Sequence, residues 1–102
     1  MHLVQVLLPL SDNAGAPFPP AFHREIRDRL TERFGGVTAY ARAPAEGQWE
    51  DEQAHRQHDD IQILEVMAEA LDHAWWAALR TELEQRLAQD EIVIRALPMV
   101  RL

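Results

Sequence analysis

The sequence contains no cysteine and no lysine. Without cysteine the chain has no disulfide framework, no thiolate metal ligand and no cysteine nucleophile, which is compatible with a reducing cytoplasm. All ten basic residues are arginines, and four of them stand directly beside an acidic residue. Because the formal net charge is -7 and the arginines are scattered, we expect neither nucleic acid nor an anionic membrane surface as a partner.

Long apolar runs are also missing. No segment approaches the ~20 apolar residues of a membrane span. The apolar start, residues 1–10, lacks the basic leader and the small-residue cleavage site of a signal peptide. We therefore expect a cytoplasmic protein. The 102 residues, 47% hydrophobic and 26% charged, are typical of one globular domain with one modest core.

The first half of the chain predicts a strand, a helix and a second strand. Residues 2–8 (HLVQVLL) are β-prone and end at Pro9, which cannot donate to a sheet ladder. Residues 21–34 place an apolar residue at every fourth position, which predicts a helix that ends at Gly35. Residues 37–43 alternate and predict a strand with two different faces. The stripe expected to be buried on the helix is Phe22, Ile26, Leu30 and Phe34.

The second half predicts a strand at 60–67, a helix and a last strand at 91–96. Asp72 is the expected N-cap of this helix. The polar segment 44–58, which contains Trp49, predicts a protruding hairpin arm. The buried stripe expected on the second helix is Trp75, Leu79, Leu83 and Leu87, with Trp76 at its edge.

The resulting order, β-α-β-β-α-β, predicts an α+β fold of the ferredoxin-like arrangement over residues 1–102. Two right-handed crossovers would place both helices on one face of a four-stranded antiparallel sheet. The other face would then be left uncovered, and we expect the function to lie there.

The order of elements, with segments 34–38 (FGGVT) and 47–49 (GQW), resembles small uncharacterised bacterial domains of the ferredoxin-like, dimeric α/β-barrel type. That architecture includes cofactor-free monooxygenases, lactone isomerases, haem-degrading enzymes and stress-response dimers. The sequence matches the catalytic residues of none of these groups, so the resemblance implies a fold and a tendency to dimerise rather than an activity.

Alternation along the strands assigns residues to the uncovered face. A sheet face in contact with water is normally more polar than this one, so the pattern indicates an interface or a ligand site. Glu65 could pair there with Arg42 or Arg95. The apolar residues expected on this face are Leu3, Leu7, Ile61, Ile63, Met67 and Val93, and the polar ones are Gln5, Thr38, Tyr40, Arg42, Glu65, Glu91 and Arg95.

Few residues carry a signal for chemistry. His55 and His58, beside two aspartates, are weak candidates for a metal site in the arm. Tyr40, Glu65 and His2 could act as general acid and base groups, although packing of Tyr40 at an interface is the simpler interpretation. The histidines at 23 and 73 are expected to be solvated on the helices.

The sequence thus predicts a small self-associating domain that dimerises through the uncovered face, has a binding or regulatory role and uses no cofactor. The alternative is a cofactor-free enzyme, of the monooxygenase or isomerase kind, that binds a small apolar ligand in a cleft on the same face. Tyr40, Arg42, Glu65 and Arg95 would line that cleft. A metal-binding arm is a third possibility.

Overall fold

Six elements follow one another in the predicted order. The computed structural model describes residues 1–42 and 61–102, so the predicted arm at 44–58, with Trp49, His55 and His58, lies outside the described residues. The elements are β1 (His2–Pro9), α1 (Pro20–Phe34), β2 (Thr38–Arg42), β3 (Ile61–Ala68), α2 (His73–Arg86) and β4 (Ile94–Pro98).

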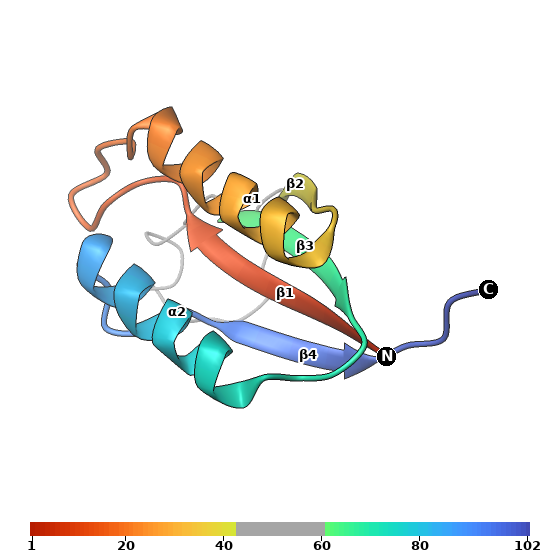
Figure 1. Cartoon of the computed structure of the whole chain (residues 1–102). Coiled ribbons are helices and arrows are strands. Elements are labelled where there is room, and N and C mark those ends of the chain that lie inside the picture. The colour runs from red at the N-terminus through yellow and green to blue at the C-terminus, as the bar shows by residue number, and fades with distance from the viewer. Residues whose placement is uncertain (43–60) are drawn as a thin grey trace, which may run out of the picture.

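The four strands form one antiparallel sheet in the order β2-β3-β1-β4. The two long strands, β1 and β3, are central, and the two short ones are the edges. Both helices lie on the same side of this sheet (Figure 1). The prediction of an α+β fold with a four-stranded antiparallel sheet and two helices is therefore confirmed.

Helix α1 begins and ends where the sequence predicts. Pro20 occupies the first turn, where its missing N–H has no partner to lose. Gly35 ends the helix in the left-handed conformation, with φ 83°, and its N–H donates to the carbonyl of Thr31 at 2.8 Å. The buried side of α1 consists of His23, Ile26 and Leu30. Phe22 and Phe34 are partly buried at its margins.

The burial of His23 contradicts the prediction of a solvated histidine. His23 is 6% exposed, and its ring contacts those of Phe18 and Phe22. Its Nε2 lies 3.0 Å from the carbonyl oxygen of Pro9. Because a carbonyl oxygen only accepts, Nε2 carries the hydrogen and donates. This bond joins α1 to the end of β1 and gives the ring a polar partner in its buried position.

Helix α2 has the predicted N-cap but a different buried tryptophan. Oδ1 of Asp72 accepts from the N–H of Trp75 at 3.0 Å. Trp76, at 8% exposure, is buried with Leu79 and Leu83, whereas Trp75 is only partly buried. The prediction that Trp75 belongs to the buried stripe is wrong, because the spacing 76, 79, 83 also fits one helix face and tertiary packing selects it.

The core lies between the helices and one face of the sheet. Alternate residues of the central strands point into it. Residues that face each other across β1 and β3 are both apolar there, as Val4 with Val66 and Val6 with Leu64. The fully buried side chains are Val4, Val6, Leu8, Ile26, Leu30, Leu64, Leu83 and Leu87.

The edge strands differ most from the prediction. On β2, Ala39 pairs with Leu64 and so shares its side of the sheet, as predicted, but Ala39 remains exposed. On β4, the strand runs over Ile94–Pro98 rather than 91–96. Pro98 is tolerated because an edge strand can leave one side of its ladder unpaired.

Candidate functional site

The side of the sheet that faces away from the helices carries a continuous chain of polar side chains, one from each strand. Gln5 of β1 donates from Nε2 to Oε2 of Glu65 on β3 at 2.6 Å. Tyr40 of β2 donates its hydroxyl to the same oxygen at 3.1 Å. Arg95 of β4 donates from Nε to Oε1 of Gln5 at 2.7 Å. We call Tyr40, Glu65, Gln5 and Arg95 the polar row, in the order in which it crosses the sheet.

Strand register explains why these residues meet. Gln5 stands directly opposite Glu65 on one side and Arg95 on the other. Tyr40 is opposite Ile63 and reaches diagonally to Glu65. Because Val4 and Val6 point into the core, Gln5 between them points to the other side. Sequence alternation predicted this side correctly for all four members of the row.

Gln5 is the link between the acidic and the basic members of the row. Its side chain is 8% exposed, and both ends of its amide are satisfied, the nitrogen by Glu65 and the oxygen by Arg95. The predicted pair between Glu65 and Arg95 does not form in the described part of the chain, because Gln5 lies between the two and bonds to each of them. Arg42, the other predicted partner, ends β2 opposite Ile61, and the structure describes its backbone alone.

The pKa of Tyr40 lies above its ordinary value of 10.0. The largest cause is partial removal of the phenol from water, and the hydrogen bond to the Glu65 carboxylate adds to it, because the neutral phenol donates that bond. Tyr40 is thus held as a hydrogen-bond donor near neutral pH rather than as a base. This pair can orient a polar group of a ligand or partner, but it is poorly suited to remove a proton.

Apolar side chains form a row on each side of the polar row. In the first apolar row, Met67 of β3, Leu3 of β1 and Leu97 of β4 are cross-strand neighbours. In the second, Leu7 of β1 pairs with Ile63 and its N–H donates to the carbonyl of Val93 at 3.0 Å. We call the three rows together the open face. Its most exposed apolar members are Met67 at 45% and Leu97 at 47%, whereas Ile63, at 4%, is already buried within the single chain.

Leu97 is the functional candidate that the sequence reasoning missed. The predicted last strand ends at residue 96, although the alternation of Val93 and Arg95 extends to position 97 and β4 runs to Pro98. The exposed residue Glu91, by contrast, precedes β4 and is not part of the open face.

The other predicted site residues are not brought together. His2 shares its side of the sheet with Ala68, which is in the core, so it lies on the opposite side from Tyr40 and Glu65. His55 and His58 lie outside the described residues. Within residues 1–42 and 61–102, no group of three side chains is arranged to hold a metal ion.

The described residues line several hollows beside the sheet, and two of them lie at its opposite edges. One, of about 530 Å³, lies where β2 begins and is lined by Leu3, Gly36, Thr38, Glu65, Met67 and Arg101, so it reaches Glu65 of the polar row. The other, of about 370 Å³, lies between α2 and β4 and is lined by Leu71, His73, Trp76, Arg80, Ile94 and Ala96. The first is the hollow that adjoins the predicted site.

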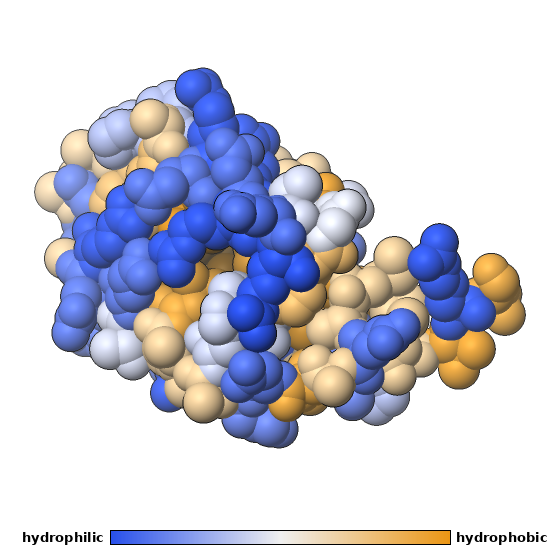
Figure 2. Space-filling model, in the orientation of Figure 1, coloured by the Kyte–Doolittle hydropathy of each residue, from blue (hydrophilic) through white to orange (hydrophobic). Residues whose placement is uncertain are grey.

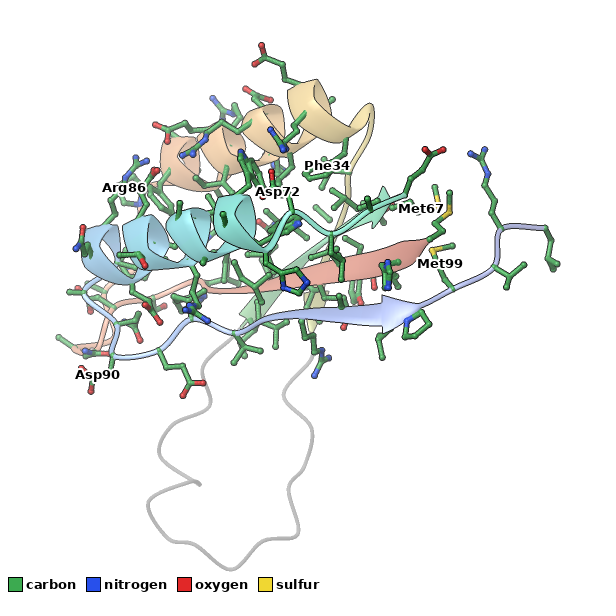
Figure 3. The ribbon with its side chains drawn as sticks, turned by 60° about the horizontal axis from the view of Figure 1, so that its bottom comes forward. Phe34, Met67, Asp72, Arg86, Asp90 and Met99 are labelled. Carbon is green, nitrogen blue, oxygen red and sulfur yellow. The ribbon has the colours of Figure 1, made fainter. Side chains whose placement is uncertain are left out.

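Ion pairs join the two helices across their outer surface. Arg86 of α2 contacts Glu25 of α1 through both terminal nitrogens, at 2.5 and 3.1 Å, and Glu82 at 3.0 Å. Arg29 of α1 donates to both carboxylate oxygens of Glu82, at 2.6 and 3.2 Å. Figure 2 shows the hydrophilic surface that results over the helices. In Figure 3 Arg86 lies on the side of α2 that faces α1.

These contacts lower the pKa of both carboxyls. For Glu25 the largest cause is the hydrogen bond from Arg86, and for Glu82 it is the hydrogen bond from Arg29. The pKa of Arg86 is raised by the same two carboxylates. The network joins the helices to each other, and we assign it a structural role.

The fold and the open face define a small α+β protein with an amphipathic sheet surface. Compared with known proteins, the chain shows no significant match to a protein-family model, a curated protein or a solved structure. Neither helix in the described part of the chain is long and apolar enough to cross a bilayer.

Proposed function

We propose that this chain is a self-associating domain that forms a homodimer through the open face, with a binding or regulatory role. The observation that carries the proposal is the pattern of that face, in which two apolar rows enclose a polar row whose hydrogen bonds are made within the chain. A face built for water would place charged residues where Leu3, Leu7 and Met67 stand.

The hydrogen bonds within the polar row make the open face better suited to burial. Polar groups cost free energy when they are buried without partners. Gln5 already bonds both Glu65 and Arg95, so its amide needs no new partner when a second copy covers the face. A second copy presents both kinds of row, and two-fold homodimers are the commonest assemblies of soluble proteins.

The arrangement of elements supports the same proposal. We infer that the fold is the ferredoxin-like one, since the order β2-β3-β1-β4 separates β1 from β2 and β3 from β4, as two interlocked strand–helix–strand units require. In the dimeric α/β-barrel domains that the sequence resembles, two such sheets pack together.

The proposal is tested by sedimentation velocity over a range of protein concentrations. We expect a dimer, and we expect Met67→Glu and Leu97→Glu to weaken it at least about tenfold, because an unpaired carboxylate is costly to bury. Both residues are exposed in one copy, so both variants should fold. Ala78→Glu, on the exposed surface of α2, is the matched control and should remain dimeric. A monomeric wild type at high concentration would overturn the proposal.

A second candidate is a cofactor-free enzyme of the monooxygenase or isomerase kind. The observation that favours it is the hollow of about 530 Å³ beside Glu65, close to the hydroxyl of Tyr40. The test is a thermal-shift screen with small aromatic compounds and lactones. A compound that raises the melting temperature of the wild type, but not of Tyr40→Phe, would favour this function over the structural one.

A further inference from the structure

On the open face, the strands on the two sides of β1 carry matching apolar residues but opposite charges. At the level of Leu3, Met67 on β3 matches Leu97 on β4. At the level of Leu7, Ile63 matches Val93. At the level of Gln5, between them, Glu65 stands on the β3 side and Arg95 on the β4 side.

From this pattern we infer the orientation of the dimer: its two-fold axis runs parallel to β1 and passes over Gln5. The inference rests on the proposed homodimer and adds how the two copies meet. A half-turn about this axis keeps each residue at the same position along the strands. It places β3 of one copy opposite β4 of the other. Each apolar residue then faces an apolar residue of the second copy, and each Glu65 faces the second copy's Arg95.

The orientation that differs by a quarter turn has the opposite electrostatic result. An axis across the strands, through the polar row, would place Glu65 over Glu65 and Arg95 over Arg95. Packed sheets lie about 10 Å apart, so side chains from the two faces meet. Like charges buried opposite each other repel strongly, and this repulsion disfavours the second orientation.

Gln5 has a specific part in the inferred arrangement. Its amide holds the carboxylate on one side and the guanidinium on the other. The two charges are therefore already oriented in the single chain, so less side-chain freedom is lost when the second copy binds. The polar row would thereby determine how the two sheets align in the dimer.

Charge reversal in two separate variants tests the orientation. The Glu65→Arg variant has arginine at positions 65 and 95, and the Arg95→Glu variant has glutamate at both of these positions. We expect each variant alone to dimerise at least tenfold more weakly than wild type in sedimentation velocity. Mixed in equal amounts, the two should form a heterodimer with an affinity near that of the wild type, because every contact between positions 65 and 95 then joins opposite charges.

Neutralisation separates the two orientations. Glu65→Gln should weaken the dimer in the inferred orientation, because it removes an attraction, and strengthen it in the other, because it removes a repulsion. The control pair is Arg24→Glu and Glu32→Arg, on the exposed surface of α1, which should leave the dimer unchanged alone and mixed. Circular dichroism checks that each variant folds.

The outcomes distinguish this inference from the proposed function. A monomeric wild type contradicts both. A dimeric wild type whose single charge reversals dimerise normally, or whose Glu65→Gln variant dimerises more tightly, contradicts the orientation and leaves the homodimer standing. Weak single variants that recover on mixing, together with a weakened Glu65→Gln, support the orientation.

Discussion

Gln5 and Glu65 face each other across β1 and β3, and the amide of the first donates to the carboxylate of the second at 2.6 Å. The same carboxylate oxygen accepts the hydroxyl of Tyr40. This pair fixes the acidic half of the polar row, and through it the chemistry of Tyr40.

Tyr40 should ionise above its ordinary pKa of 10.0, since partial desolvation and Glu65 both favour the neutral phenol. The chain has one tyrosine, so tyrosinate absorbance at 295 nm reports this residue alone. Glu65→Gln should bring the midpoint closer to 10. An identical midpoint in wild type and variant would contradict the role of the carboxylate.

The raised pKa of Tyr40 also sets a direction for stability at alkaline pH. Above pH 10 the unfolded chain loses the phenol proton while the folded chain keeps it, so stability should fall as pH rises through the folded pKa. Tyr40→Phe lacks this proton and should lose less stability between pH 9 and pH 11. Urea unfolding at fixed pH measures the difference.

The ion pairs of Arg86 should stabilise the protein above the ordinary carboxyl pKa of 4.5 and less below it. The pKa values of Glu25 and Glu82 are lowered in the fold, so their contribution is complete above 4.5 and is lost as the carboxyls take up protons at lower pH. Arg86→Gln should lower the melting temperature at pH 7, with a smaller effect at pH 3 and in 1 M salt. Arg24→Gln, exposed on α1, is the control and should change little.

Trp76 should matter more for stability than Trp75. Trp76 stacks on Phe34 with ring centroids 5.2 Å apart and is buried in the core. Trp75 is partly exposed, with the guanidinium of Arg33 over its ring at 4.4 Å. Trp76→Ala should cost about 3–5 kcal/mol in urea unfolding, and Trp75→Ala clearly less. Equal losses would contradict the assignment of the buried stripe.

Replacing His23 by a residue of similar size that has no hydrogen-bond donor should lower the free energy of unfolding. His23→Phe keeps an aromatic ring between Phe18 and Phe22 but leaves the carbonyl of Pro9 without its hydrogen bond. We expect a loss of about 1–3 kcal/mol. His73→Phe, on the exposed start of α2, should have little effect on unfolding. A loss at position 23 no greater than at 73 would mean that the bond does not contribute.

Gly35 and Gly36 form a natural pair for testing the end of α1. Gly35 has φ 83°, which strains any residue with a Cβ, although no atom lies close enough to clash. Gly36 does not have a positive φ. Gly35→Ala should therefore cost about 1 kcal/mol, and Gly36→Ala less, in thermal or urea unfolding. Equal effects would indicate that the left-handed cap is not a requirement.

The sequence by itself determined the order of the elements and the two faces of the central strands. Alternation in β1, β2 and β3 placed Gln5, Tyr40 and Glu65 on one side of the sheet, because side chains on a strand point to opposite faces in turn. The same period-two rule separated the apolar rows from the core. Gly35 and Asp72 marked helix ends through local backbone chemistry, which needs no distant partner.

Tertiary structure alone decided which residues meet. Gln5 and Arg95 are 90 positions apart, and their contact follows from the pairing of β1 with β4, which no local pattern specifies. Trp76 and His23 are buried because of what packs on them, since two adjacent helix faces can each satisfy the apolar spacing. The order of acid, amide and base across the sheet is likewise a property of strand order, because periodicity assigns a residue to a face but not to a neighbour.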